Sequence, residues 1–107
     1  MDPASDLLFK TLGDPTRRAL FERLARGDAL TVRALTARSG VSQPAVSRHL
    51  GVLRRAGLVE ARPDGRETHY RARPQGLQPL LGWMAHYAAF WEGRFDALED
   101  LLKRMDQ

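Results

Sequence analysis

The chain has 107 residues, 43% of them apolar, which suits one globular domain with a modest core. It contains no cysteine, so disulfides and thiolate metal sites are excluded. The net charge of +4 is unevenly distributed: residues 1–76 hold 14 basic and 8 acidic residues, a balance of +6, whereas residues 77–107 hold 3 and 5, a balance of −2. Arginine dominates the basic residues, and its planar guanidinium suits phosphate and base-edge contacts. A genome-wide preference for arginine would explain that ratio but not the segregation of charge.

The N-terminal segment has no basic stretch followed by an apolar run, so it does not resemble a signal peptide. No run of 18 apolar residues occurs either, so no membrane span is predicted. We therefore expect a soluble cytoplasmic protein without a membrane partner.

The first half of the chain is predicted to form short helices. The segment DLLFKTLG, residues 6–13, is rich in apolar residues and ends in a glycine. Asp14 can cap the next helix, Pro15 suits its first position, and Gly27 ends it.

Two further helices follow with a very short connection. Thr31 can cap the first of them and Ser42 the second, which runs to about Ala56 and stops at Gly57. Only about three residues, including a glycine, separate the two helices. Residues 31–56 therefore read as a helix-turn-helix.

After Gly57 the periodicity changes from helical to alternating. The segment LVEARPDGRETHYRAR carries a turn signal, RPDGR, between two alternating runs. Residues 58–73 are therefore predicted to form a β-hairpin wing directly behind the second helix. The expected fold is mainly α with this small hairpin (α+β), in one domain over residues 1–107.

The rest of the chain is predicted to be one long helix over residues 77–105. Its apolar residues are spaced alternately four and three apart over four heptads; they are Leu77, Leu81, Met84, Ala88, Trp91, Phe95, Leu98, Leu102 and Met105. A second apolar stripe consists of Leu80, Trp83, Tyr87 and Phe90. One small core cannot cover both stripes, so a second copy of the chain is the expected partner. The alternative is that both stripes are buried within a single chain.

The second helix of the pair has one face for the core and another for a partner. Val46, Leu50 and Leu53 lie on the core side at 100° per residue. The opposite face carries Pro44, Arg48, Gly51 and Arg55, and Gln43, Ala45 and Ser47 lie around the first turn. A proline in the first turn removes no needed hydrogen bond. His49 lies toward the core edge, where a structural hydrogen bond is expected.

This face has the chemistry needed to contact DNA. Gln43 can pair with adenine, Arg48 with guanine, and Ser47 with a base or a phosphate. The helix N-terminus itself favours phosphate. Each side chain alone could be an ordinary solvated residue, but together, after a tight turn and before an arginine-flanked wing, they indicate DNA binding.

The segments LGDPTRRALFERLARGD, SQPAVSRHLGVLRRAGLVEARPDGRETHYRA and WMAHYAAFWEGRFDALEDLL resemble the arsenic-repressor (ArsR) family of winged helix-turn-helix regulators, in its cysteine-poor branch. The resemblance covers nearly the whole chain. It implies a homodimer in which the first and last helices pair and two recognition helices contact an inverted-repeat operator. It also implies repression, usually released by a ligand.

Carried across by position, the resemblance and the helix pattern together predict two sets of residues. The predicted DNA-binding residues are Ser42, Gln43, Pro44, Ala45, Ser47, Arg48, Arg55, Arg62 and Arg66. The predicted dimer interface comprises Leu7, Leu8, Leu81, Met84, Ala88, Trp91, Phe95, Leu98 and Leu102.

The known metal sites of that family do not carry over. Residues 31–37, where one type has a Cys-x-Cys pair, lack a thiol, and only His86 stands near the ligand positions of another type. A site built from His86 and carboxylates across a dimer is left open. No metal, cofactor or catalytic residue is predicted, and the chain is not expected to be an enzyme.

The aromatic cluster of Trp83, Tyr87, Phe90 and Trp91 could line a pocket for a small-molecule effector or form the packed interface. The operator, the regulated genes and the effector cannot be read from the sequence. The alternative function is a winged-helix module for protein interaction or dimerisation, without sequence-specific DNA binding.

Overall fold

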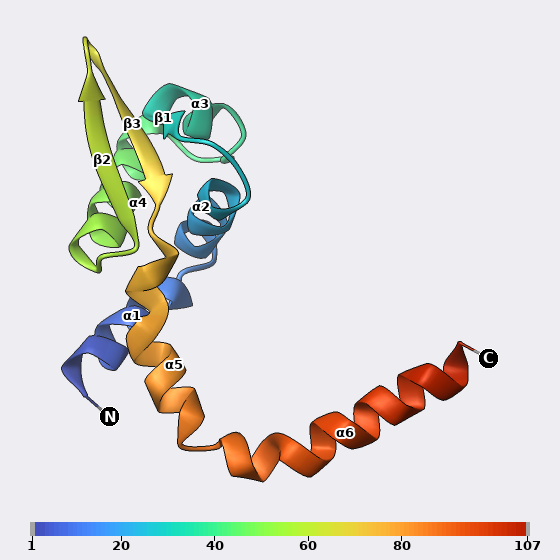
Figure 1. Cartoon of the computed structure of the whole chain (residues 1–107). Helices are drawn as coiled ribbons and strands as arrows, with labels where there is room; N and C mark the ends of the chain where they lie inside the picture. Colours follow the sequence, from blue (N-terminus) through green and yellow to red (C-terminus); the bar gives the residue numbers. More distant parts are fainter. Residues whose placement is uncertain (1, 107) are drawn as a thin grey trace.

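The structure is a computed structural model that describes residues 2–106, and of Ala89, Trp91, Glu92 and Phe95 it describes the main chain alone. Figure 1 shows a compact body of helices and a small sheet from which the C-terminal helix projects. The elements in chain order are α1 (Pro3–Gly13), α2 (Pro15–Ala25), β1 (Leu30–Thr31), α3 (Val32–Ala37), α4 (Gln43–Arg55), β2 (Val59–Asp64), β3 (Glu67–Ala72), the 3₁₀ turn η1 (Pro74–Leu77), α5 (Gln78–Ala85) and α6 (Ala88–Met105).

The first four helices each begin at a side-chain cap. Such a cap satisfies an N–H group that has no partner inside the helix and stabilises the helix by about 1 kcal/mol. The predicted caps Asp14, Thr31 and Ser42 are confirmed, and Asp2 caps α1. Their side-chain oxygens accept from the main-chain N–H groups of Arg17 (2.9 Å), Ala34 (3.1 Å), Ala45 (3.3 Å) and, for Asp2, Ser5 (2.8 Å).

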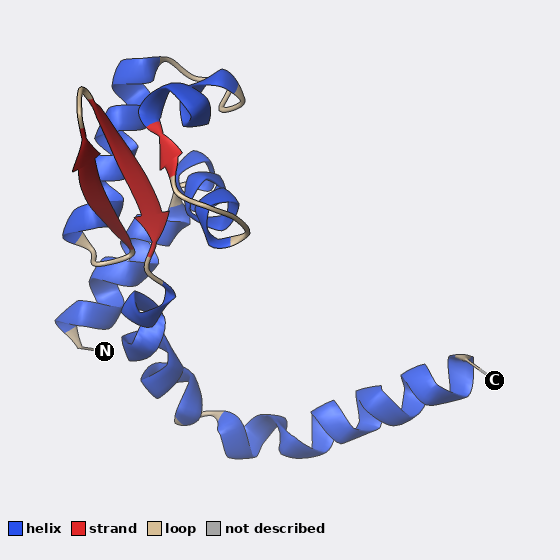
Figure 2. Cartoon of the chain, turned by 45° about the horizontal axis from the view of Figure 1, so that its top comes forward, coloured by secondary structure: helices blue, strands red, loops and turns tan. Residues whose placement is uncertain are grey.

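The three strands form one antiparallel sheet in the order β1-β3-β2. The predicted hairpin is confirmed, with Ala61 opposite Tyr70 and Arg62 opposite His69, and Gly65 turns the chain at φ +66°. Strand β1 was not predicted, because two residues are too short to show an alternating pattern. Figure 2 shows several helices gathered around this small sheet, while the C-terminal helix extends away from it.

The core lies between the sheet and helices α1 to α4. Val46, Leu50 and Leu53 are fully buried, which confirms the predicted orientation of α4. The buried apolar residues are Leu8, Leu20, Phe21, Leu24, Leu35, Val46, Leu50, Leu53, Leu58, Val59 and Ala72. The structure therefore leaves the opposite face of α4 free.

The prediction of one continuous helix over residues 77–105 is wrong. The helix ends at Ala85, and α6 starts at Ala88 in a new direction (Figure 1). At the break, the N–H groups of His86 and Tyr87 donate to carbonyls three residues back, at 3.2 and 3.0 Å, as in a 3₁₀ turn. Trp83 packs edge-on against Phe9 of α1, with ring centroids 5.2 Å apart, and so holds the end of α5 on the body. Heptad spacing could not reveal the break, because side-chain periodicity does not report whether every main-chain bond reaches four residues back.

Candidate nucleic-acid interface

The N-terminal half of α4 presents a polar surface to solvent. Ser42, Gln43, Pro44, Ser47 and Arg48 are exposed, while Ala45 is half-buried. The side chains of Gln43, Ser47 and Arg48 make no hydrogen bond or ion pair with any residue in the part of the chain that the structure describes. These side chains are therefore available to an external partner.

The turn before α4 is held rigidly. Gly40 has φ +76°, a left-handed conformation that glycine adopts without strain. The Ser39 hydroxyl lies 3.0 Å from the Thr36 carbonyl oxygen and 3.1 Å from the main-chain nitrogen of Val41, which donates to it. These bonds fix the connection between α3 and α4, so the start of α4 is presented in a defined direction.

The C-terminal end of α4 is tied to the wing. Gly57, at φ +77°, donates its N–H to the Arg54 carbonyl at 3.0 Å, and the Leu58 N–H donates to the Leu53 carbonyl at 3.0 Å. The Arg73 N–H then donates to the Leu58 carbonyl at 2.7 Å. The wing consequently keeps a fixed position relative to α4.

Two of the predicted DNA-binding arginines lie on the wing, and a third lies at the end of α4. Arg66 is exposed at the hairpin tip beside Gly65, and Arg62 is exposed on β2. Arg55 is also exposed, and its guanidinium lies over Gly51, where an added Cβ would be 3.5 Å from Nη1. The lack of a side chain at position 51 leaves room for that guanidinium along the helix surface.

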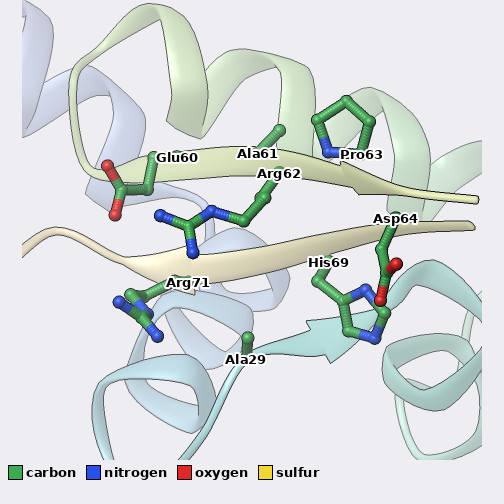
Figure 3. Close-up of a pocket in the computed structure, with 8 residues that line it drawn as sticks. All are labelled: Ala29, Glu60, Ala61, Arg62, Pro63, Asp64, His69 and Arg71. Carbon is green, nitrogen blue, oxygen red and sulfur yellow. The ribbon is translucent and has the colours of Figure 1, made fainter.

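A shallow hollow of about 480 Å³ lies on the outer face of the wing sheet. Figure 3 shows Arg62 and Arg71 extending from neighbouring strands over this hollow, with His69 and Asp64 toward the hairpin tip. Glu60 lies at the other end (Figure 3). Arg71 was not among the predicted residues, although the alternation and the register of the hairpin place it on the same face as Arg62. Its two arginines are balanced by the carboxylates of Glu60 and Asp64, so this surface has no excess of positive charge.

The residue next to Arg48, His49, is half-buried and is hydrogen-bonded to the body of the protein. Arg17 Nε donates to His49 Nδ1 at 3.4 Å, and Arg17 Nη1 donates to the Thr11 carbonyl oxygen at 3.3 Å. The structural hydrogen bond predicted for His49 is thus confirmed. The main-chain N–H of Arg17, bound to the carboxylate, lowers the pKa of Asp14, and the nearby His49 and Arg17 side chains act in the same direction. No sequence signal could have paired residues 17 and 49, which are 32 positions apart.

Helices α1, α5 and α6 together present an apolar surface to solvent. Leu7 is 45% exposed and Leu81 63%, and Met84, Ala88, Leu98 and Leu102 are also exposed. The prediction that Leu8 lies at the dimer interface is wrong: it is 2% exposed in the single chain, where it belongs to the core. The side chains of Trp91 and Phe95 lie outside the described residues.

The aromatic residues are partly packed and partly open. The Trp83 ring lies 5.1 Å from that of Tyr87, and both rings line a hollow of about 500 Å³ together with Asp2 and His86. The guanidinium of Arg94 lies 4.3 Å from the centre of the exposed Phe90 ring.

The described side chains include no group of three or more His, Asp or Glu residues that could hold a metal ion. Among the described helices, none is both long and apolar enough to cross a bilayer.

A helix-turn-helix whose second helix is followed directly by a β-hairpin defines a winged helix-turn-helix protein. A family model described as a helix-turn-helix domain matches residues 12–62. The chain belongs to the ArsR family of winged helix-turn-helix transcriptional regulators, and it is a DNA-binding regulator of transcription.

This assignment rests on relatives and on solved structures. The HTH-type transcriptional regulator Rv2034 of Mycobacterium tuberculosis is 48% identical over 75 residues, which are 70% of this chain and 69% of the relative. The biofilm growth-associated repressor of Agrobacterium fabrum is 42% identical over 84 residues, 78% of this chain and 69% of the relative.

An ArsR-like transcriptional regulator from Rhodococcus sp. RHA1 has a solved structure that matches with a TM-score of 0.71 at 31% identity, over 92% of each chain. The solution structure of a homodimeric winged helix-turn-helix DNA-binding domain from Mycobacterium bovis matches with a TM-score of 0.63 at 27% identity. That match spans 80% of this chain and 79% of the other.

Proposed function

We propose that the protein is a homodimeric repressor that binds an inverted-repeat operator through residues 42–56 and the wing at residues 58–73. The observation that carries this proposal is the free polar surface at the start of α4. There the side chains of Gln43, Ser47 and Arg48 are exposed and make no bond to any described residue, at the end of a rigid turn and next to a wing with exposed arginines. This surface has the donors and acceptors that base edges require.

The roles of the residues follow from their chemistry. Arg48 would donate two hydrogen bonds to a guanine, and Gln43 would pair with an adenine. Ser47 and the capped start of α4 would contact bases or phosphate, with Pro44 and Ala45 small enough to allow close approach. Arg55, Arg62 and Arg66 would neutralise phosphates. None of these steps needs catalysis, and we infer that the protein acts on DNA in the cytoplasm without enzymatic activity.

The proposed dimer is supported by the exposed apolar side chains of α1, α5 and α6. Leu81, Leu98 and Leu102 are each more than half exposed in the single chain, which is costly for a protein in water. The related domain from M. bovis is homodimeric. A two-fold dimer would place two recognition helices about 34 Å apart, so that each contacts one half-site of a palindrome.

Repression is proposed because a relative that is 42% identical is named as a repressor. A dimer bound across a promoter can block transcription by occupancy alone. An effector, if one exists, must bind one dimer geometry more tightly than the other to release the operator. The hollow beside Trp83 and Tyr87 is where we would look for such a ligand, although these rings also serve as packing.

The proposal is tested by selecting bound sequences from random duplex DNA. We expect enrichment of an inverted repeat with half-sites about 10 base pairs apart, centre to centre. The logarithm of the affinity should fall linearly with the logarithm of salt concentration, because phosphate contacts release counterions. Failure to enrich any sequence would favour the alternative, an interaction module without sequence-specific DNA binding.

The dimer makes a separate prediction. Replacing Leu98 and Leu102 together with glutamate should raise the dimer dissociation constant at least about 100-fold, since each buried leucine contributes about 1.5–3 kcal/mol. Sedimentation velocity over a concentration series measures this constant. Arg104→Glu is the control, because it adds the same residue to the opposite face of α6 and should leave the dimer intact. A double variant that still sediments like the wild-type protein would show that α6 does not form the interface.

A further inference from the structure

The N-terminal half of α4 is held to the body by very few apolar contacts. Among residues 43–49 only Val46 is buried, whereas Leu50 and Leu53 anchor the later turns. Val46, Leu50 and Leu53 decide which face of α4 points to the core, but apolar packing is not directional and leaves the helix room for a small rotation about its axis. A directional bond near the first turns would restrict that rotation and so help the exposed side chains to meet base edges at set positions.

Arg17 supplies that bond. Its guanidinium links three helices, because Nε donates to His49 Nδ1 of α4 at 3.4 Å and Nη1 donates to the Thr11 carbonyl of α1 at 3.3 Å, while the residue itself belongs to α2. The main-chain N–H of Arg17 is in turn fixed by the Asp14 carboxylate at 2.9 Å. His49 and Arg17 are both half-buried, so water screens the bond only in part.

We propose that His49, held by Arg17, is the positioning residue that sets the rotation of α4 and thereby aligns Arg48 with its base. This inference rests on the proposed role of Arg48 in base recognition. Arg48 precedes His49 directly, so the two side chains point about 100° apart and one can be fixed inside while the other faces DNA. An arginine head lies roughly 9 Å from its helix axis, so a rotation of about 10° would displace it by roughly 1.5 Å. A shift of that size breaks a bidentate base contact but is tolerated by a contact to phosphate.

This distinction gives the inference a measurable signature. Loss of the His49 bond should lower the affinity for the operator while leaving the affinity for random duplex DNA nearly unchanged. The useful quantity is therefore the specificity ratio, the operator affinity divided by the random-DNA affinity. The ratio does not change when part of a sample is unfolded, because unfolding lowers both affinities equally. The ratio also cancels the effect of losing a positive charge, because that loss weakens binding to operator and random DNA alike.

The experiment compares His49→Leu, His49→Asn, Arg17→Met and the double variant Arg17→Met/His49→Leu by fluorescence anisotropy on the selected operator and a random duplex. We expect His49→Leu and Arg17→Met each to lower the ratio about five- to tenfold, the worth of one lost hydrogen bond. The asparagine oxygen can replace Nδ1 as acceptor, so His49→Asn should remain within about twofold of the wild-type protein. The double variant should lower the specificity ratio no further than the more affected single variant does, because both substitutions remove the same hydrogen bond.

Three results would overturn the inference. The specificity ratio could be unchanged in His49→Leu, or it could fall as far in His49→Asn as in His49→Leu. In the double variant, it could fall by the product of the two single-variant losses. Arg48→Ala, measured alongside, separates this outcome from failure of the proposed function. If Arg48→Ala lowers the ratio and His49→Leu does not, base recognition stands and the positioning role is wrong. If Arg48→Ala leaves the ratio unchanged, base recognition by Arg48 and the positioning role of His49 are both wrong.

Discussion

Replacement of Arg48 by alanine is expected to weaken binding to the selected operator by about 1–3 kcal/mol and to change binding to random duplex DNA by less than about threefold. A guanidinium that donates two bonds to a guanine is matched to one base pair, whereas random DNA offers it only a phosphate. The Arg48 side chain is exposed and makes no bond to the rest of the described chain, so its removal leaves no buried partner unsatisfied. Equilibrium titration of both duplexes at one salt concentration measures the two affinities.

Arg54→Ala is the matched control for this prediction. Arg54 is an exposed arginine in the last turn of the same helix, outside the predicted set of contacts. It carries the same charge as Arg48, so the two variants share any long-range electrostatic effect. An equal loss on operator and random DNA in Arg48→Ala would identify a phosphate contact instead of a base contact, and no loss on either would remove Arg48 from the interface.

Replacement of Gly76 by alanine is expected to lower the free energy of unfolding by about 3 kcal/mol, at the upper end for an overpacked site. An added Cβ would overlap the Gly57 carbonyl oxygen and lie 2.9 Å from its carbonyl carbon and 3.3 Å from Leu58 Cδ2. The Gly57 carbonyl also accepts a hydrogen bond from Arg73 Nη1 at 3.3 Å, and the Gly57 N–H donates to the Arg54 carbonyl at the end of α4. The main chain of Gly57 therefore has little freedom to move away.

The loss of stability should appear as a fall in the melting temperature of about 10–20 °C, which circular dichroism can follow. Gly27→Ala is the control, because an added Cβ there would meet no atom within 4 Å and should change stability by no more than about 0.5 kcal/mol. A Gly76→Ala variant that melts within about 2 °C of the wild-type protein would show that the two segments can separate without cost. The same substitution would also displace the base of the wing, since Gly76 packs directly on the junction between α4 and β2.

The features that sequence predicted correctly depend on residues close together in the chain. A cap such as Ser42 acts on an N–H three residues later, and the burial of Val46 and Leu50 follows from the pitch of one helix. The hairpin also depends on local alternation and a turn at Gly65. Such signals are contained in short segments, so a single sequence is enough to detect them.

The failures lie where distant segments meet. Leu8 was assigned to a dimer surface because its spacing on α1 cannot show which side faces the core, and the structure buries it. The end of α5 was missed because the contact between Trp83 and Phe9 joins residues far apart in sequence. Arg71 was overlooked because its position beside Arg62 depends on the register of two strands.

The helix-turn-helix, the wing and the polar face of α4 can therefore be predicted from the residues alone, because periodicity, caps and turns are local. Three other features required the folded chain: the bond between Arg17 and His49, the need for a residue without a side chain at Gly76, and the break of the C-terminal helix at His86 and Tyr87. Each of these depends on which atoms of separate elements come within a few ångströms of one another, and no local pattern of residue types encodes that distance.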